Sequence, residues 1–115
     1  MPQRRDPLEP VWKALASPVR RAILDDLRDG PQTTGALAER FPRLTRFAVM
    51  QHLRVLEEAE LVIPRRQGRE RYNYLNPVPI QRVFDRWVSR YMKPWTEALV
   101  GLRSELETQS RKERA

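Results

Sequence analysis

The sequence predicts a mainly α-helical fold with one small β-hairpin, and two observations support this prediction. Apolar residues recur three and four positions apart over most of the chain, which is the spacing of amphipathic helices. Two short strand-like segments, 61–66 and 70–75, interrupt this pattern and bracket Gln67–Gly68–Arg69. Glycine suits such a turn because it adopts backbone conformations that other residues avoid. Helices followed by an arginine-tipped hairpin indicate a winged helix-turn-helix.

The length of the chain favours one small domain. The 115 residues fall within the usual size of a single domain. We expect residues 1–115 to form one winged helix-turn-helix domain, with a core at about 8–75 and a C-terminal dimerisation helix at about 77–110. A small domain buries a limited share of its surface, so association of two copies would add apolar burial.

The net charge and the absence of cysteine indicate which kind of partner and which cellular compartment are favoured. The net charge of +7 favours a polyanionic partner, although such charge also serves plain solubility. The absence of cysteine excludes disulfides and thiolate zinc sites, and it fits the cytoplasm. No apolar run resembles a signal peptide or a membrane span. We therefore expect a cytoplasmic protein with no membrane partner.

Two helices are expected at the start of the chain, after a frayed segment Met1–Asp6. A first amphipathic helix is predicted by apolar residues at helical spacing, namely Leu8, Val11, Trp12 and Leu15. Ser17–Pro18 predicts the start of a second helix, because serine caps helices and proline fits the first turn. Asp29–Gly30–Pro31 is expected to end it.

The next two helices form the expected helix-turn-helix. Thr33 or Thr34 can cap a short helix over 35–41, which Pro42 ends, and Thr45 can cap a helix that runs to about Ala59. The latter has an apolar face and an opposite polar and basic face, as in helices that enter a DNA major groove. An ordinary exposed helix face is the alternative. Its candidate DNA-binding residues are Thr45, Arg46, Phe47, Met50, Gln51, His52 and Arg54.

The hairpin is expected to add further DNA contacts. In its second strand Tyr72 and Tyr74 share one face, while Arg71 and Asn73 share the other, as a half-buried strand requires. We expect phosphate or minor-groove contacts, rather than solubility alone, from the arginines of the hairpin, which are Arg65, Arg66, Arg69 and Arg71.

The C-terminal region has a helical apolar stripe longer than so small a domain can cover. Pro94 lies within it and predicts a kink or break near Tyr91 to Lys93, whereas residues 110–115 are expected to be disordered. We interpret the stripe as a dimer interface rather than an internal core. The candidate interface residues from both ends of the chain are Leu8, Val11, Trp12, Leu15, Phe84, Trp87, Val88, Tyr91, Trp95, Leu99, Leu102 and Leu106.

Four stretches of the chain, 12–24, 37–40, 48–62 and 68–72, resemble the ArsR-type winged-helix repressors of prokaryotes. The resemblance implies a homodimer built from the first and last helices, which binds an imperfect palindrome at a promoter and blocks transcription. The turn Pro42–Arg43–Leu44 is one residue longer than the family spacing. The segment after Leu75 resembles a subgroup that often regulates a neighbouring gene for a START-like protein. For control we expect autoregulation that depends on protein concentration, and the alternatives are a partner protein or an apolar or anionic ligand near Trp87, Tyr91 and Trp95.

The residues argue against a metal sensor and against an enzyme. The thiolate site of the family would need cysteines near Gln32–Gly35, and its alternative site would need histidine within 81–106, which has none. His52 is the sole histidine, so we expect no transition metal and no cofactor. The chain also lacks an evident nucleophile–base pair. A winged-helix protein-interaction module that does not bind DNA remains an alternative, which the basic hairpin disfavours.

Overall fold

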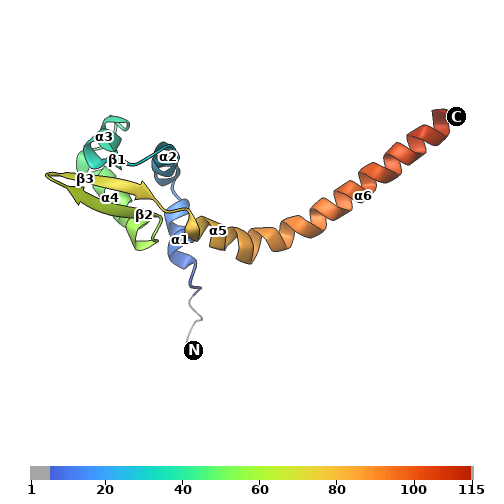
Figure 1. Ribbon diagram of the computed structural model, residues 1–115, viewed down its shortest axis with the longest axis horizontal. Helices are drawn as coiled ribbons and strands as arrows, with labels where there is room; N and C mark the ends of the chain where they lie inside the picture. Colours follow the sequence, from blue (N-terminus) through green and yellow to red (C-terminus); the bar gives the residue numbers. More distant parts are fainter. Residues whose placement is uncertain (1–5, 115) are drawn as a thin grey trace. The chain divides into compact units, whose positions relative to one another are not determined.

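The computed structural model describes residues 6–114, so the expectation of a frayed start falls largely on residues outside it. The chain divides into two compact units, Met1–Arg82 and Val83–Ala115, which are described here one at a time. In chain order, the elements of the first unit are α1 (Glu9–Leu15), α2 (Pro18–Leu27), β1 (Gln32–Thr33), α3 (Thr34–Glu39), α4 (Arg46–Glu58), β2 (Val62–Gln67), β3 (Glu70–Leu75) and α5 (Val78–Val83), the last of which ends at the boundary (Figure 1).

The helix starts follow the side-chain caps that the sequence predicts. The Ser17 hydroxyl accepts a hydrogen bond from the Arg20 amide at 3.3 Å, and Pro18 occupies the first position of α2. Thr33 caps α3 by accepting from the Ala36 amide at 3.1 Å. α3 ends at Glu39, two residues earlier than Phe41, where the sequence suggested its end.

The core of the first unit lies between the helices and the sheet. The apolar faces predicted for α2 and α4 are buried, as are Leu8 and Val11 near the start of the chain. This burial stabilises the helix-turn-helix and leaves the opposite face of α4 in water. The core residues of α2, α3 and α4 are Ile23, Leu24, Leu27, Leu37, Val49, Leu53 and Leu56.

The hairpin belongs to a three-stranded antiparallel sheet in the order β1-β3-β2. The sequence pattern did not predict β1, a two-residue strand in which Gln32 pairs with Asn73. The one fully buried residue of β3, Asn73, lies on the polar face of the strand, between the partly buried Arg71 and Leu75. Its amide nitrogen donates to the Gln32 carbonyl and to the Thr34 hydroxyl, each at 3.1 Å. These bonds satisfy both donors of the buried amide nitrogen.

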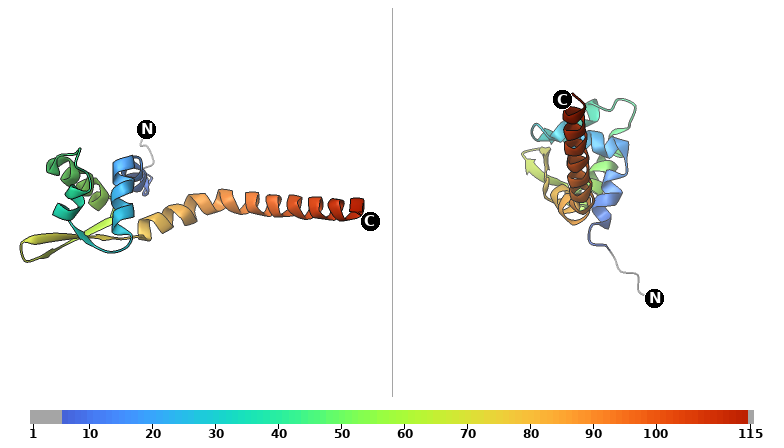
Figure 2. Two further views of the ribbon diagram at one scale, coloured as in Figure 1. Left: turned by 90° about the horizontal axis from the view of Figure 1, so that it is seen from above. Right: turned by 90° about the vertical axis from the view of Figure 1, so that its right-hand side faces the viewer.

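The second unit consists of η1, a π-helical turn over Phe84–Val88, and α6, which spans Ser89–Arg114. Of the kink or break expected near Tyr91 to Lys93, the break is wrong, because α6 continues on both sides of Pro94 (Figure 2). Proline removes one backbone donor but its φ is compatible with a helix, and 26 residues supply many other bonds. The expectation of disorder over 110–115 was also wrong for residues 110–114, since α6 continues to Arg114, and Ala115 lies outside the described residues. Over residues 6–114, no helix has both the length and the apolar character needed to cross a membrane.

Candidate nucleic-acid interface

α4 presents an exposed face with mixed chemistry. The Thr45 hydroxyl accepts from the Ala48 amide at 3.0 Å, so this side chain fixes the start of the helix. Behind it, Phe47 is 69% exposed and Met50 is 49% exposed, which is unusual for large apolar side chains unless a partner covers them. The remaining exposed candidates on this face offer guanidinium and amide groups, and they are Arg46, Gln51 and Arg54.

His52 lies differently from the other candidates on α4. Its ring is partly buried, and its Nδ1 lies 3.3 Å from Nη1 of Arg20. Burial, and then the charge of Arg20, lower the pKa of His52. Arg20 also donates to the carbonyls of Lys13 and Ala14 at the end of α1, at 2.7 and 2.9 Å. His52 therefore contributes to the packing of α4 against α2, with its Nδ1 already engaged.

The wing consists of β2, β3 and the turn between them, and its arginines lie on both faces of this hairpin. The turn depends on Gly68, whose φ of 65° is in the left-handed region. Arg66 lies opposite Arg71 in the β2–β3 ladder, whereas Arg65 lies opposite Tyr72. Because residues directly opposite each other share a face of the sheet, Arg66 and Arg71 lie on one face and Arg65 on the other.

A cleft of about 410 Å³ lies between the wing and α4, which is the helix expected to enter the major groove and is called the recognition helix below. The cleft is lined by four guanidinium groups and one carboxylate, that of Glu70. Glu70 accepts a hydrogen bond from the Tyr72 hydroxyl at 3.2 Å, and this bond raises the pKa of Tyr72. An anion such as a backbone phosphate suits this charge. The lining residues are Thr33, Thr34, Gly35, Arg46, Met50, Arg66, Arg69, Glu70 and Arg71.

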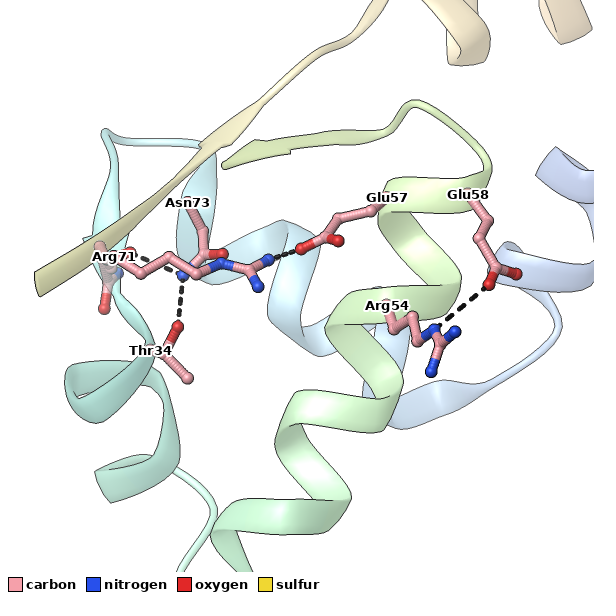
Figure 3. Close-up of polar contacts among 7 residues, drawn as sticks. Thr34, Arg54, Glu57, Glu58, Arg71 and Asn73 are labelled. Carbon is pink, nitrogen blue, oxygen red and sulfur yellow. Dashed lines mark hydrogen bonds and ion pairs between the residues drawn. The ribbon is translucent and has the colours of Figure 1, made fainter. Parts of the chain in front are cut away.

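Arg71 differs from the other wing arginines because it forms an ion pair with Glu57 of α4 (Figure 3). Only 34% of the Arg71 side chain and 24% of the Glu57 side chain are exposed. Burial lowers the pKa of Arg71 from its ordinary value. Sequence reasoning placed Arg71 with the DNA contacts and missed Glu57. An acid on a helix face has no signal of its own that identifies its partner on a distant strand.

The apolar stripe of the second unit is exposed along α6. Trp95 is 67% exposed and Leu99 is 60% exposed, and the rings of Trp87 and Tyr91 lie with their centroids 4.8 Å apart. The other stripe residues that are more than one third exposed are Phe84, Leu102 and Leu106. A row of this size on one helix is typical of a surface that a partner covers.

The candidate interface residues of α1 fall into two groups. Trp12 is 38% exposed and Leu15 is half-buried, whereas Leu8 and Val11 are buried in the core of their own unit. Trp12 is therefore the more exposed of the apolar candidates on α1. Within residues 6–114, no three acidic or histidine side chains gather in a way that would hold a metal ion.

Comparison with known proteins gives consistent matches. Residues 15–65 match the model of a family described as a helix-turn-helix domain. The HTH-type transcriptional regulator Rv2034 of Mycobacterium tuberculosis is 40% identical over 94 residues, covering 79% of this chain and 80% of that protein. The transcriptional repressor SdpR of Bacillus subtilis is 38% identical over 71 residues, covering 62% of this chain and 78% of that protein.

Solved structures agree in fold over most of the chain. The ArsR family transcriptional regulator RHA00566 superposes with a TM-score of 0.71 at 31% identity, covering 84% of this chain and 97% of that one. An ArsR-like transcriptional regulator from Rhodococcus sp. RHA1 gives 0.69 at 28% identity, covering 88% and 91%. These matches agree with the exposed face of α4 and with the arginine-rich cleft. They are matches to transcriptional regulators and not to enzymes. The chain belongs to the ArsR family of winged helix-turn-helix regulators, which bind DNA to control transcription.

Proposed function

We propose that the protein is a homodimeric repressor that binds a two-fold symmetric operator in a promoter. The observation that supports this most directly is the cleft between α4 and the wing, where four arginines meet the exposed start of the recognition helix. A helix in the major groove and a wing over the adjacent backbone would place a phosphate near this cleft.

The chemistry of each side chain on this surface suggests which part of the DNA it would contact. Gln51 has the amide geometry that suits an adenine edge, and arginines such as Arg46 and Arg54 suit guanine or phosphate. Phe47 and Met50 offer apolar surface of the kind that contacts a thymine methyl group. Arg66 and Arg69 would neutralise backbone phosphates from the wing.

Dimerisation is supported by the apolar stripe on α6. Trp95, Leu99, Leu102 and Leu106 are spaced three and four residues apart within α6, so they lie along one side of this helix. A second copy of the chain would cover this stripe along the helix, with Trp12 of α1 as a further contribution. Two-fold pairing would present two recognition helices to a palindromic site.

For control, we propose that operator occupancy follows protein concentration, with the regulator repressing its own promoter. The transition-metal route lacks ligands, since the chain has no cysteine and one histidine. Binding to a promoter requires the compartment that holds the chromosome, and on that ground we propose a cytoplasmic location.

The test is a nuclease footprint on the DNA upstream of the protein's own coding sequence, together with selection from random duplexes. We expect a symmetric site whose half-sites are about one helical turn apart, roughly 34–36 Å. If each dimer neutralises six to ten phosphates, log affinity should fall against log salt with a slope of roughly −5 to −9. Arg69→Ala should flatten this slope by about one for each phosphate that it no longer neutralises. Failure to enrich any sequence, with affinity independent of salt, would contradict the proposal.

A further inference from the structure

The inner face of β3 is joined to both helices of the helix-turn-helix by polar side chains. Arg71 pairs with Glu57 of α4, and Asn73 donates to the Thr34 hydroxyl at the start of α3 at 3.1 Å (Figure 3). Asn73 is completely buried and the Arg71–Glu57 pair is partly buried. Partly buried charged contacts of this kind depend on geometry more strongly than surface pairs do.

The ion pair also reduces the repulsion between two like charges in the hairpin. Arg71 and Arg66 lie opposite each other in the ladder, and like charges opposite each other destabilise a strand pair. The Glu57 carboxylate compensates the charge of Arg71, whereas Arg66 forms no ion pair with any residue of 6–114. α4 thereby helps to determine which wing arginines are left to bind a polyanion.

The same pair defines one boundary of the cleft described above. Arg71 lines the cleft on the side of the wing, while Arg46 and Met50 line it on the side of α4. A contact from Arg71 to Glu57 near the end of α4 therefore restrains the separation between the wing and the recognition helix. Contacts to bases and contacts to phosphates must be made simultaneously, and both depend on that separation.

We propose that Glu57 and Arg71 are positioning residues for DNA recognition, which set the spacing between the recognition helix and the wing without contacting DNA themselves. This inference rests on the proposed function. It assigns Arg71 to the structure of the interface and leaves Arg66 and Arg69 as the phosphate-binding arginines of the hairpin. Discrimination between operator and random DNA should therefore depend on Glu57, a residue outside the exposed face of α4.

The test compares Glu57→Gln with the matched control Glu58→Gln. Glu58 forms an exposed ion pair with Arg54 at 3.6 Å on the same helix, and both substitutions remove one negative charge. A general electrostatic gain in affinity would therefore appear in both variants. Affinities are measured for a selected operator duplex and for a random duplex at several salt concentrations. We expect Glu57→Gln to reduce the ratio of operator to random affinity by roughly tenfold. Glu58→Gln releases Arg54, which the proposed function places on DNA, so this variant should leave the ratio unchanged or raise it.

Arg71→Ala supplies the measurement that separates positioning from direct binding. We expect it to reduce discrimination as Glu57→Gln does, while the salt slope on random DNA stays at the wild-type value. Arg66→Ala should instead flatten that slope by about one for each phosphate left without its arginine. The double variant Glu57→Gln, Arg71→Ala should lose no more discrimination than either single variant, because the two residues act through one ion pair.

Two results would overturn the inference. A salt slope flattened by Arg71→Ala as much as by Arg66→Ala would make Arg71 a phosphate-binding residue. Equal discrimination in the Glu57→Gln and Glu58→Gln variants would remove the positioning role. Urea unfolding of each variant identifies any loss of fold, and the double variant, which leaves no unpaired charge, repeats the test if Glu57→Gln is unstable. A wild-type protein that binds neither duplex would instead overturn the proposed function, and the inference with it.

Discussion

Arg20 of α2 and His52 of α4 interact through nitrogen atoms 3.3 Å apart, Nη1 of the guanidinium and Nδ1 of the imidazole. Arginine carries only donors, so Nδ1 must accept this hydrogen bond. The ring is then neutral, with its proton on Nε2. The contact that joins the recognition helix to α2 therefore requires an unprotonated histidine.

We predict that the protein loses stability in mildly acidic solution through His52. Burial and the charge of Arg20 lower the pKa of His52 in the folded state below its ordinary value of 6.5. The folded state thus disfavours the proton more than the unfolded state does. The stabilising contribution is fully present above pH 6.5 and is lost as the pH falls through the folded pKa. The measurement is the free energy of urea unfolding between about pH 7.5 and 5.

His52→Gln serves as the control for this prediction, because His52 is the only histidine of the chain. Glutamine offers a neutral side-chain acceptor that does not titrate, so the variant should lose the part of the pH dependence that lies nearest neutrality. Superimposable pH profiles for the wild type and the variant would show that the Arg20 interaction does not depend on the charge of His52.

α4 is followed by a non-glycine residue, Glu60, in the left-handed region of backbone conformation. Glu60 has a φ of 61°, and the Leu61 amide donates to the Leu56 carbonyl at 2.9 Å, as in a helix that ends through a left-handed residue. Glutamate is strained in this region, whereas glycine is not. Glu60→Gly should raise the free energy of unfolding by on the order of 0.5–1 kcal/mol, as measured by urea denaturation. A loss of stability of this size would show that glutamate is not strained there.

Much of the helix-turn-helix could be predicted from the sequence because its signals are local. Ser17, Thr33 and Thr45 each cap a helix within three residues, and the apolar spacing of α4 identifies which face is buried. Gly68 marks the turn of the wing for the same reason, since its φ of 65° is a property of the turn itself. These features depend on neighbours along the chain and need no knowledge of distant contacts.

The features that sequence reasoning missed depend on residues far apart. Strand alternation identified the two faces of β3 but not which one is buried, because the partners of Asn73 lie at Gln32 and Thr34. The ion pair of Arg71 could not be predicted for the same reason, since its partner Glu57 belongs to another element. Pro94 gave the opposite error in part. The local rule allowed a kink or a break, and the break does not occur, because the surrounding helical residues of α6 keep the helix continuous.

We predict that a charged stripe on α6 prevents dimer formation. Trp95→Glu combined with Leu99→Glu would bury two unpaired carboxylates per chain at the proposed interface, which costs at least a few kcal/mol. The dissociation constant of the dimer should rise at least about 100-fold, and sedimentation should show a folded monomer.

Val100→Glu is the matched control for the dimer experiment. Val100 is 59% exposed on the same helix, but it follows Leu99 and so points about 100° away from it. This variant should remain a dimer. A stable dimer in the Trp95, Leu99 double variant would contradict the assignment of the stripe to the interface.

We predict that transition metals do not release the protein from DNA. Zinc sites need three or four converging donors, soft metals select thiolates, and the chain offers no cysteine and one histidine. Operator affinity should therefore stay constant when zinc, nickel, copper or arsenite is added at micromolar concentration. Calorimetry on the free protein is the second readout, and stoichiometric binding coupled to loss of operator affinity would contradict this expectation.

Base reading by the exposed face of α4 underlies the whole proposed function, and Gln51→Ala is the variant that tests it. The measurement is the affinity of this variant for the selected operator and for a random duplex at one salt concentration. We predict a loss of about 1–3 kcal/mol on the operator and almost no change on random DNA. Arg69→Ala, by contrast, should weaken binding to both duplexes. Equal losses on the two duplexes for Gln51→Ala would contradict sequence readout by this face.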